Sequence, residues 1–294
     1  MLDISRGTKR GIALSTAPLL AGIAMQYAVG PADIRATAFP VNACIGAGFA
    51  LSLIIAYLLR NKSALINGLT SCAAAIAAIA SVIIVTLITG IVKQTSDTSS
   101  AWHDMLSSWP FILSYTWLAV ILGLTTVKNI ATFSLRKAPV AFSHAGLLLA
   151  LICGALGSAD VCRLDMPVSE GHTEWQTIDN DSRITMAPFG ITLDRLEIKV
   201  SADNMPEQIS ACITADRKSG ARDIFSVKVN HPIRIDGWDV YLSDYSEPAS
   251  GFTTATFRLI RDPWLPAVYA GIAMMSIGAL LTLFLRTDRK KPAS

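Results

Sequence analysis

The residue best suited to chemistry in this sequence is His144, which lies within the apolar run Val140–Ser158, a stretch without any Asp, Glu, Lys or Arg. A titratable group in hydrocarbon is costly, so such a residue is a functional candidate by default. Imidazole is a common axial ligand of haem iron. The alternative is a neutral imidazole that hydrogen-bonds a neighbouring helix, and the residues by themselves leave both interpretations open.

The elements that position His144 belong to a membrane protein. Of the 294 residues, 52% are hydrophobic and only 16% are charged, against about 25% charged in soluble globular domains. The mean hydropathy is +0.46. The net charge is only +3 and the sequence has no long basic run, so it does not indicate nucleic-acid binding.

Spanning a bilayer as a helix takes about 20 mostly apolar residues. About six runs meet this requirement, and they predict about six transmembrane helices. The runs are Gly11–Val29, Pro40–Leu59, Gly68–Val92, Phe111–Val127, Val140–Ser158 and Leu265–Leu285. In this arrangement His144 lies about five residues, or roughly 8 Å, inside its helix.

Basic residues flank these runs on alternate sides, and Lys and Arg in short connections favour the cytoplasm. They precede the first run, follow the second, separate the fourth from the fifth and follow the sixth, as Arg6, Arg60, Lys128 and Arg286 illustrate. We therefore expect a multi-pass protein with both termini cytoplasmic and its longest connection outside. A cleaved signal peptide ending near Ala36-Thr37-Ala38 is a rival for the first run, but the run is longer than the usual 7–15 residues, which favours a retained helix.

The segment between the last two runs has a different pattern. Apolar and polar residues alternate as in half-buried strands, and pairs such as Ser219-Gly220 and Asp236-Gly237 indicate turns. We expect an extracytoplasmic antiparallel β domain between helices 5 and 6. The predicted organisation is therefore residues 1–158 as transmembrane helices 1–5, 159–263 as the β domain, and 264–294 as the last helix with a basic cytoplasmic tail. The expected strands include Pro188–Val200, Ile209–Thr214, Ile224–Val229, Ile233–Leu242 and Thr253–Leu259.

Two of the five cysteines, Cys162 and Cys212, fall in the segment expected outside, where a disulfide can persist. They are the candidate disulfide, although sequence does not reveal whether their Cα atoms come close enough. The sequence has no CxxC motif, which argues against a thiol exchanger of the thioredoxin type.

Other function classes lack their characteristic residues. The apolar runs contain no carboxylate and no buried Lys or Arg for an ion relay, and no inverted repeat is visible, which argues against a secondary transporter. No Ser/His/Asp set, metal-ligand cluster or phosphate-binding loop indicates a self-contained enzyme, so no catalytic residue is predicted.

Several segments, most of them in the second half of the chain, resemble the ResB family, also called CcsB, of system II cytochrome c biogenesis. The resemblance is strongest from Gln94 onward. The segments are Ile88-Thr-Gly-Ile-Val-Lys-Gln, Ser108-Trp-Pro-Phe, Phe142-Ser-His-Ala-Gly-Leu, Pro188-Phe-Gly-Ile-Thr-Leu, Val229-Asn-His-Pro-Ile, Gly237-Trp-Asp-Val-Tyr-Leu and Asp262-Pro-Trp.

The resemblance implies a subunit of a cytochrome c synthase in the bacterial inner membrane. Such a subunit works with a CcsA-type membrane protein, here expected to be a separate chain, and the pair passes haem b across the bilayer and attaches it to apocytochrome c. The resemblance also places His144 at the position of the family's membrane-embedded haem histidine. At most, then, this chain is one part of a holocytochrome c synthase. The rival role is structural: stabilising the partner or holding apocytochrome c without touching haem.

The remaining histidines are weaker candidates. His103 follows Trp102 ahead of the fourth run, and the pair is a candidate outer contact for haem or apocytochrome c. An ordinary aromatic pair at the membrane interface is the simpler interpretation, and we favour it. His172 reads as a solvated loop residue and His231 as incidental, so haem iron through His144 is the only predicted metal contact.

Overall fold

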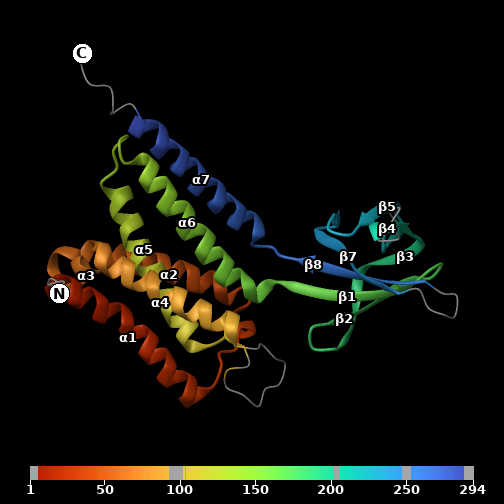
Figure 1. The fold of residues 1–294 in the computed structure, drawn as a ribbon, viewed down its shortest axis with the longest axis horizontal. Coiled ribbons are helices and arrows are strands. Elements are labelled where there is room, and N and C mark those ends of the chain that lie inside the picture. Colours follow the sequence, from red (N-terminus) through yellow and green to blue (C-terminus); the bar gives the residue numbers. More distant parts are fainter. Residues whose placement is uncertain (1–5, 93–101, 103, 201–205, 247–252, 288–294) are drawn as a thin grey trace. The chain divides into compact units, whose positions relative to one another are not determined.

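The computed structural model describes residues 6–92, 102, 104–200, 206–246 and 253–287 (Figure 1). The chain divides into two compact units. One comprises residues 1–160 and 264–294 and is helical; the other, residues 161–263, is built from β-strands. The β unit is thus an insertion between two helices of the helical unit.

Five helices are long and apolar enough to cross a membrane, by length and composition. These candidate spans are Val41–Lys62, Cys72–Ile91, Trp109–Ala131, Ala138–Asp160 and Leu265–Phe284. The α-helices of the unit are α1 (Arg6–Val29), α2 (Val41–Leu59), α3 (Ala64–Leu69), α4 (Cys72–Ile91), α5 (Trp109–Ala131), α6 (Ala138–Gly157) and α7 (Leu265–Thr287). Three short 3-10 helices, η1 (Ile34–Thr37), η2 (Arg60–Lys62) and η3 (Ser158–Asp160), connect them.

The first predicted span differs from the other five. Its residues form α1, in which the apolar stretch found among the described side chains is Thr16–Val29. The sequence predicts about six spans, and five candidate spans are found among the described residues.

Helices α6 and α7 approach so closely that glycine is needed at the contact. A Cβ atom on Gly146 would lie 2.5 Å from the carbonyl oxygen of Gly271 and 2.5 Å from the amide nitrogen of Met275. A Cβ atom on Gly271 would lie 2.6 Å from the backbone of Ala150. Small residues allow helix backbones to pack this closely within lipid, where no hydrophobic effect drives association.

The β unit is one eight-stranded antiparallel sheet in the order β5-β4-β3-β2-β1-β8-β7-β6. Its strands are β1 (Cys162–Ser169), β2 (Thr173–Asp179), β3 (Ile184–Val200), β4 (Pro206–Arg217), β5 (Arg222–Lys228), β6 (Ile233–Ile235), β7 (Trp238–Ser246) and β8 (Thr254–Arg261). Sequence missed β1 and β2. The single strand expected over Ile233–Leu242 is a hairpin, because Asp236 and Gly237 take positive φ angles of 48° and 84° and turn the chain.

One face of the sheet forms the core of the β unit. Alternate residues such as Met166, Phe189, Ile213 and Phe257 are fully buried there. The edge strand β5 also contacts β6 and β7, so the sheet curls until its two edges meet. Curling hides edge strands that would otherwise offer unpaired backbone groups to other chains.

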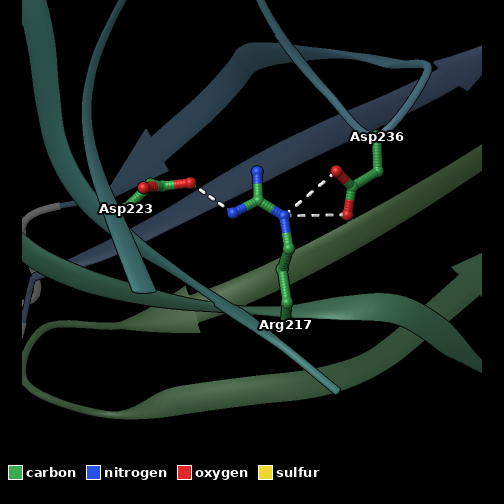
Figure 2. Close-up of polar contacts among 3 residues, drawn as sticks. All are labelled: Arg217, Asp223 and Asp236. Carbon is green, nitrogen blue, oxygen red and sulfur yellow. Dashed lines mark hydrogen bonds and ion pairs between the residues drawn. The ribbon is translucent and has the colours of Figure 1, made fainter. Parts of the chain in front are cut away.

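Arg217 ties these edges together (Figure 2). Its Nε donates to both carboxylate oxygens of Asp236, at 3.0 and 3.1 Å, and its Nη1 pairs with Asp223. Asp223 belongs to β5, whereas Asp236 lies in the turn between β6 and β7. Hydrogen bonds to Asp223 and then Asp236 raise the pKa of the Arg217 guanidinium, which is therefore charged at neutral pH.

The contact between α6 and α7 predicts how two glycine substitutions on α6 differ. Gly146→Leu should destabilise the helical unit by about 1–3 kcal/mol, because the side chain must displace backbone atoms of α7. Gly154→Leu should be tolerated, because nothing lies within 4 Å of its Cβ position. Heating each full-length variant in detergent and measuring the monodisperse fraction by size-exclusion chromatography checks this. Equal midpoints for the two variants would contradict the packing described.

Candidate functional site

His144 lies on α6, six residues after the helix begins at Ala138, which is about 9 Å along the axis. Its Nδ1 is 2.8 Å from the carbonyl oxygen of Val140, one turn earlier. A carbonyl oxygen only accepts hydrogen bonds, so Nδ1 must carry the proton. In the neutral ring Nε2 then presents its lone pair. A backbone carbonyl that holds one ring nitrogen in this way is a common feature of metal-ligating histidines.

Helical spacing places His144 on the side of α6 that carries Leu151, away from the seam with α7. His144 and Leu151 are seven residues apart, close to two turns, so they share a face. The carbonyl oxygen of Leu151 accepts a hydrogen bond from the hydroxyl of Tyr115 on α5, at 2.8 Å. The seam with α7 is made instead by Ser143 and Gly146.

The surroundings of the His144 ring leave the lone pair of Nε2 available to one metal ion. The His144 side chain is half-buried. Within the described part of the chain, Nε2 has no hydrogen-bond partner, and no group of three or more His, Cys, Asp or Glu is placed to hold a metal ion. Iron bound at Nε2 would need its second axial ligand from another donor.

Of the predicted outer pair, His103 lies outside the described residues, and Trp102 packs edge-on against Tyr27 with ring centroids 5.7 Å apart. Nearby, the end of α1 is bonded to the start of α5. The backbone N–H of Trp109 donates to the buried side chain of Gln26 at 2.9 Å, and its indole donates to the carbonyl of Gly30 at 3.0 Å. These contacts describe an aromatic anchor between helix ends.

The other two histidines belong to the β unit. His172 lies exposed in the turn between β1 and β2, where its Nδ1 is 3.2 Å from the carbonyl oxygen of Glu170. His231 is exposed between β5 and β6, and its backbone N–H donates to Lys228. Neither ring is buried, and they sit in different turns, so they form no shared site.

A polar cluster around Asp160, which sequence reasoning missed, joins three segments of the helical unit. Its Oδ1 accepts from the backbone N–H of Phe39 at 2.8 Å. Its Oδ2 accepts from the amide of Asn42 at 2.7 Å and from the indole of Trp264 at 2.6 Å. Asn42 is fully buried and also donates to the carbonyl of Leu156 at 3.0 Å. The segments carrying Asn42, Asp160 and Trp264 are therefore fastened at one point.

The position of this cluster gives it a structural meaning. Asp160 is the last residue of the helical unit before the β unit, and Trp264 is the first one after it. The sequence signal was an amide in one apolar run and a carboxylate at the end of another, but residues 118 positions apart cannot be paired from one sequence.

The candidate disulfide between Cys162 and Cys212 is wrong: both thiols are free. Cys162 begins β1 and Cys212 lies on β4, and β2 and β3 separate these strands in the sheet. Neighbouring strands are about 4.8 Å apart, so two intervening strands hold the Cα atoms beyond the roughly 7 Å that a disulfide can bridge.

The fold and site define a class, a membrane protein that carries a β unit between its last two helices. The model of the ResB-like family matches residues 133–254, which run from the end of α5 to the beginning of β8 and include His144. This match supports an assignment to the ResB family, as the resemblance indicated, and it suggests a role in cytochrome c biogenesis. The comparison with curated proteins finds no match.

The cluster predicts graded effects at Asp160. Asp160→Ala removes the acceptor of three donors, one of them on the fully buried Asn42. A buried donor left unpaired costs about 1–3 kcal/mol, so the midpoint of thermal unfolding should fall clearly. Asp160→Asn keeps one acceptor oxygen, so its midpoint of thermal unfolding should lie between those of Asp160→Ala and the parent. An alanine variant as stable as the parent would show that the cluster is dispensable.

The separation of the two exported cysteines predicts two free thiols. After denaturation without reductant and treatment with iodoacetamide, mass spectrometry should find both Cys162 and Cys212 alkylated. Burial raises the pKa of the Cys162 thiol. That thiol should therefore be protonated at neutral pH in the folded chain and react more slowly there than after unfolding. A peptide pair linked through Cys162 and Cys212 would refute the strand order.

Proposed function

We propose that this chain is the ResB-type subunit of a system II cytochrome c synthase. It handles haem b within the membrane and presents it, together with a CcsA-type partner, for covalent attachment to apocytochrome c. The observation that carries the proposal is the orientation of His144. Its Nδ1 hydrogen-bonds the carbonyl oxygen of Val140, while Nε2 keeps its lone pair.

The chemistry of the ring fits an iron ligand. Haem iron accepts a neutral imidazole through one nitrogen, and a hydrogen bond from the other nitrogen fixes the ring and increases its basicity. The backbone carbonyl of Val140 supplies that second interaction from the same helix. Because His144 is a single donor, the second axial ligand is proposed to come from the partner or from a weaker donor such as a methionine.

The proposed setting is the bacterial inner membrane, with both termini cytoplasmic and the β unit outside. The support is the alternation of Lys and Arg along the short connections. In this orientation His144 lies near the inner leaflet, where haem made in the cytoplasm would arrive. The chain is at most one part of a holocytochrome c synthase, and the CcsA-type partner supplies the rest.

A structural role is the second candidate, and the Asp160 cluster favours it. That cluster holds the two crossings to the β unit at one point, as expected of a scaffold that presents apocytochrome c or stabilises the partner. Under this alternative the hydrogen bond to Val140 satisfies His144 within its own helix, and haem touches only the partner.

Replacing His144 separates the two roles. The complex with the CcsA-type partner is purified with His144→Ala, and haem absorbance per mole of protein is recorded. We expect bound haem to fall about tenfold or more, since even groups that only support a metal ligand change affinity 10–100-fold. Added imidazole should restore part of the spectrum. Size-exclusion chromatography confirms that the amount of complex is unchanged.

The control is His231→Ala, which removes an exposed imidazole from the β unit and should leave the haem content at the parental value. If the His144 variant also keeps its haem and its spectrum, the ligand role is refuted. In that case the structural role would be the better description.

A further inference from the structure

One end of the sheet in the β unit is tethered to the membrane by the covalent chain. β1 begins at Cys162, two residues after Asp160, which ends a candidate span. β8 ends at Arg261, four residues before the next candidate span begins at Leu265. An extended chain covers at most about 3.5 Å per residue, so these connections reach about 7 and 14 Å. This end of the sheet therefore stays close to the lipid headgroups, whose layer is about 5–8 Å thick on each side.

The hairpin of β2 and β3 points toward the same end. β2 runs antiparallel to β1, with Leu164 paired to Asp179 and Asp165 to Ile178. The turn of residues 180–183 follows directly, so it lies level with the first residues of β1 (Figure 1). Within the β unit, the hairpin tip and both tethered strand ends thus share one end of the sheet.

The outer face of this tip is apolar. Ile178, Ile184 and Met186 are 42%, 72% and 64% exposed. Ile178 and Ile184 are direct cross-strand partners, and Met186 follows Ile184 on the same face because side chains alternate along a strand. On the opposite face the hydroxyls of Thr177 and Thr185 hydrogen-bond at 2.9 Å. The hairpin is therefore two-sided, with its apolar side turned outward.

The tip is held in a defined shape. The Oδ1 of Asp179 accepts from the backbone N–H groups of Asp181 and Arg183, both at 2.8 Å. The backbone N–H of Asp179 donates to the carbonyl of Arg183 at 3.0 Å. The three apolar side chains are thus presented on a structured turn, and the guanidinium of Arg183 beside them is 75% exposed and lies 3.9 Å from the carboxylate of Asp181. Apolar side chains with an adjacent cation are the composition that favours the lipid interface.

We propose that the β2–β3 hairpin tip is a lipid-contacting element. Ile178, Ile184 and Met186 enter the acyl boundary of the leaflet beside the β unit, and Arg183 lies at the level of the phosphates. The bilayer is the occupant because the covalent connections keep this end of the sheet beside it. The contact would limit rotation of the β unit about its two tethers. The proposal does not depend on haem binding.

Photo-crosslinking tests the contact in the full-length protein. The photoreactive residue p-benzoylphenylalanine replaces Ile184 in one variant and Ile224 in the other. Ile224 is the matched control, because it is 73% exposed in the same sheet but lies on β5, outside the hairpin. Both variants are reconstituted into vesicles of phosphatidylethanolamine and phosphatidylglycerol, irradiated and examined by mass spectrometry for the mass of an added phospholipid.

We expect lipid adducts several-fold more abundant at position 184 than at position 224. Equal yields at the two positions would overturn the proposal. Irradiation in cells provides a second test. If position 184 crosslinks to a protein there and gains no lipid in vesicles, the tip is a protein-docking surface and the lipid contact is likewise refuted.

Discussion

The arrangement of the helical unit depends on the hydrogen bonds that the carboxylate of Asp160 accepts. A separate unit of 103 residues, residues 161–263, is inserted between α6 and α7. Without a local link, closing so long a connection would rely on helix packing alone, and loop closure carries an entropic penalty. Asp160 removes this difficulty, because it bonds the indole of Trp264 across the insertion and the buried amide of Asn42 on α2. The ends of α6 and α7 are thereby held together.

This fastening determines what the rest of α6 can do. The part of α6 that precedes Asp160 packs on one side against α7, where glycines bring the two backbones together. On another side it accepts a hydrogen bond from Tyr115 of α5. The segment Phe142-Ser-His-Ala-Gly-Leu shows both uses within two turns: Gly146 serves the seam with α7, and His144 points away from it. The position and direction of one imidazole therefore follow from packing contacts made by its neighbours.

The helices and strands could be predicted from the sequence where their signals are local. Apolar length predicted α2, α4, α5, α6 and α7, and alternation predicted β3, β4, β5 and β8. β2 was not predicted because one of its buried positions is occupied by the polar residue Thr177. The hydroxyl of Thr177 hydrogen-bonds Thr185 across the hairpin, a contact that the sequence does not reveal. The Cys162–Cys212 pairing failed for a related reason, since strand order is decided by distant contacts. Likewise the Asp160 cluster brings together residues that no periodicity connects.

The distribution of burial indicates how such a chain would function with others. α5 is the central helix, with 39% of its apolar window buried against α1, α2, α4 and α6, whereas the windows of α2 and α7 are only 11% buried. Most of the surface of these two helices is left for lipid or for another membrane protein. His144 is half-buried and presents the lone pair of Nε2 away from the seam with α7, and one imidazole leaves an axial position of iron open. A second chain could supply that ligand, which is why the proposed function is that of a subunit.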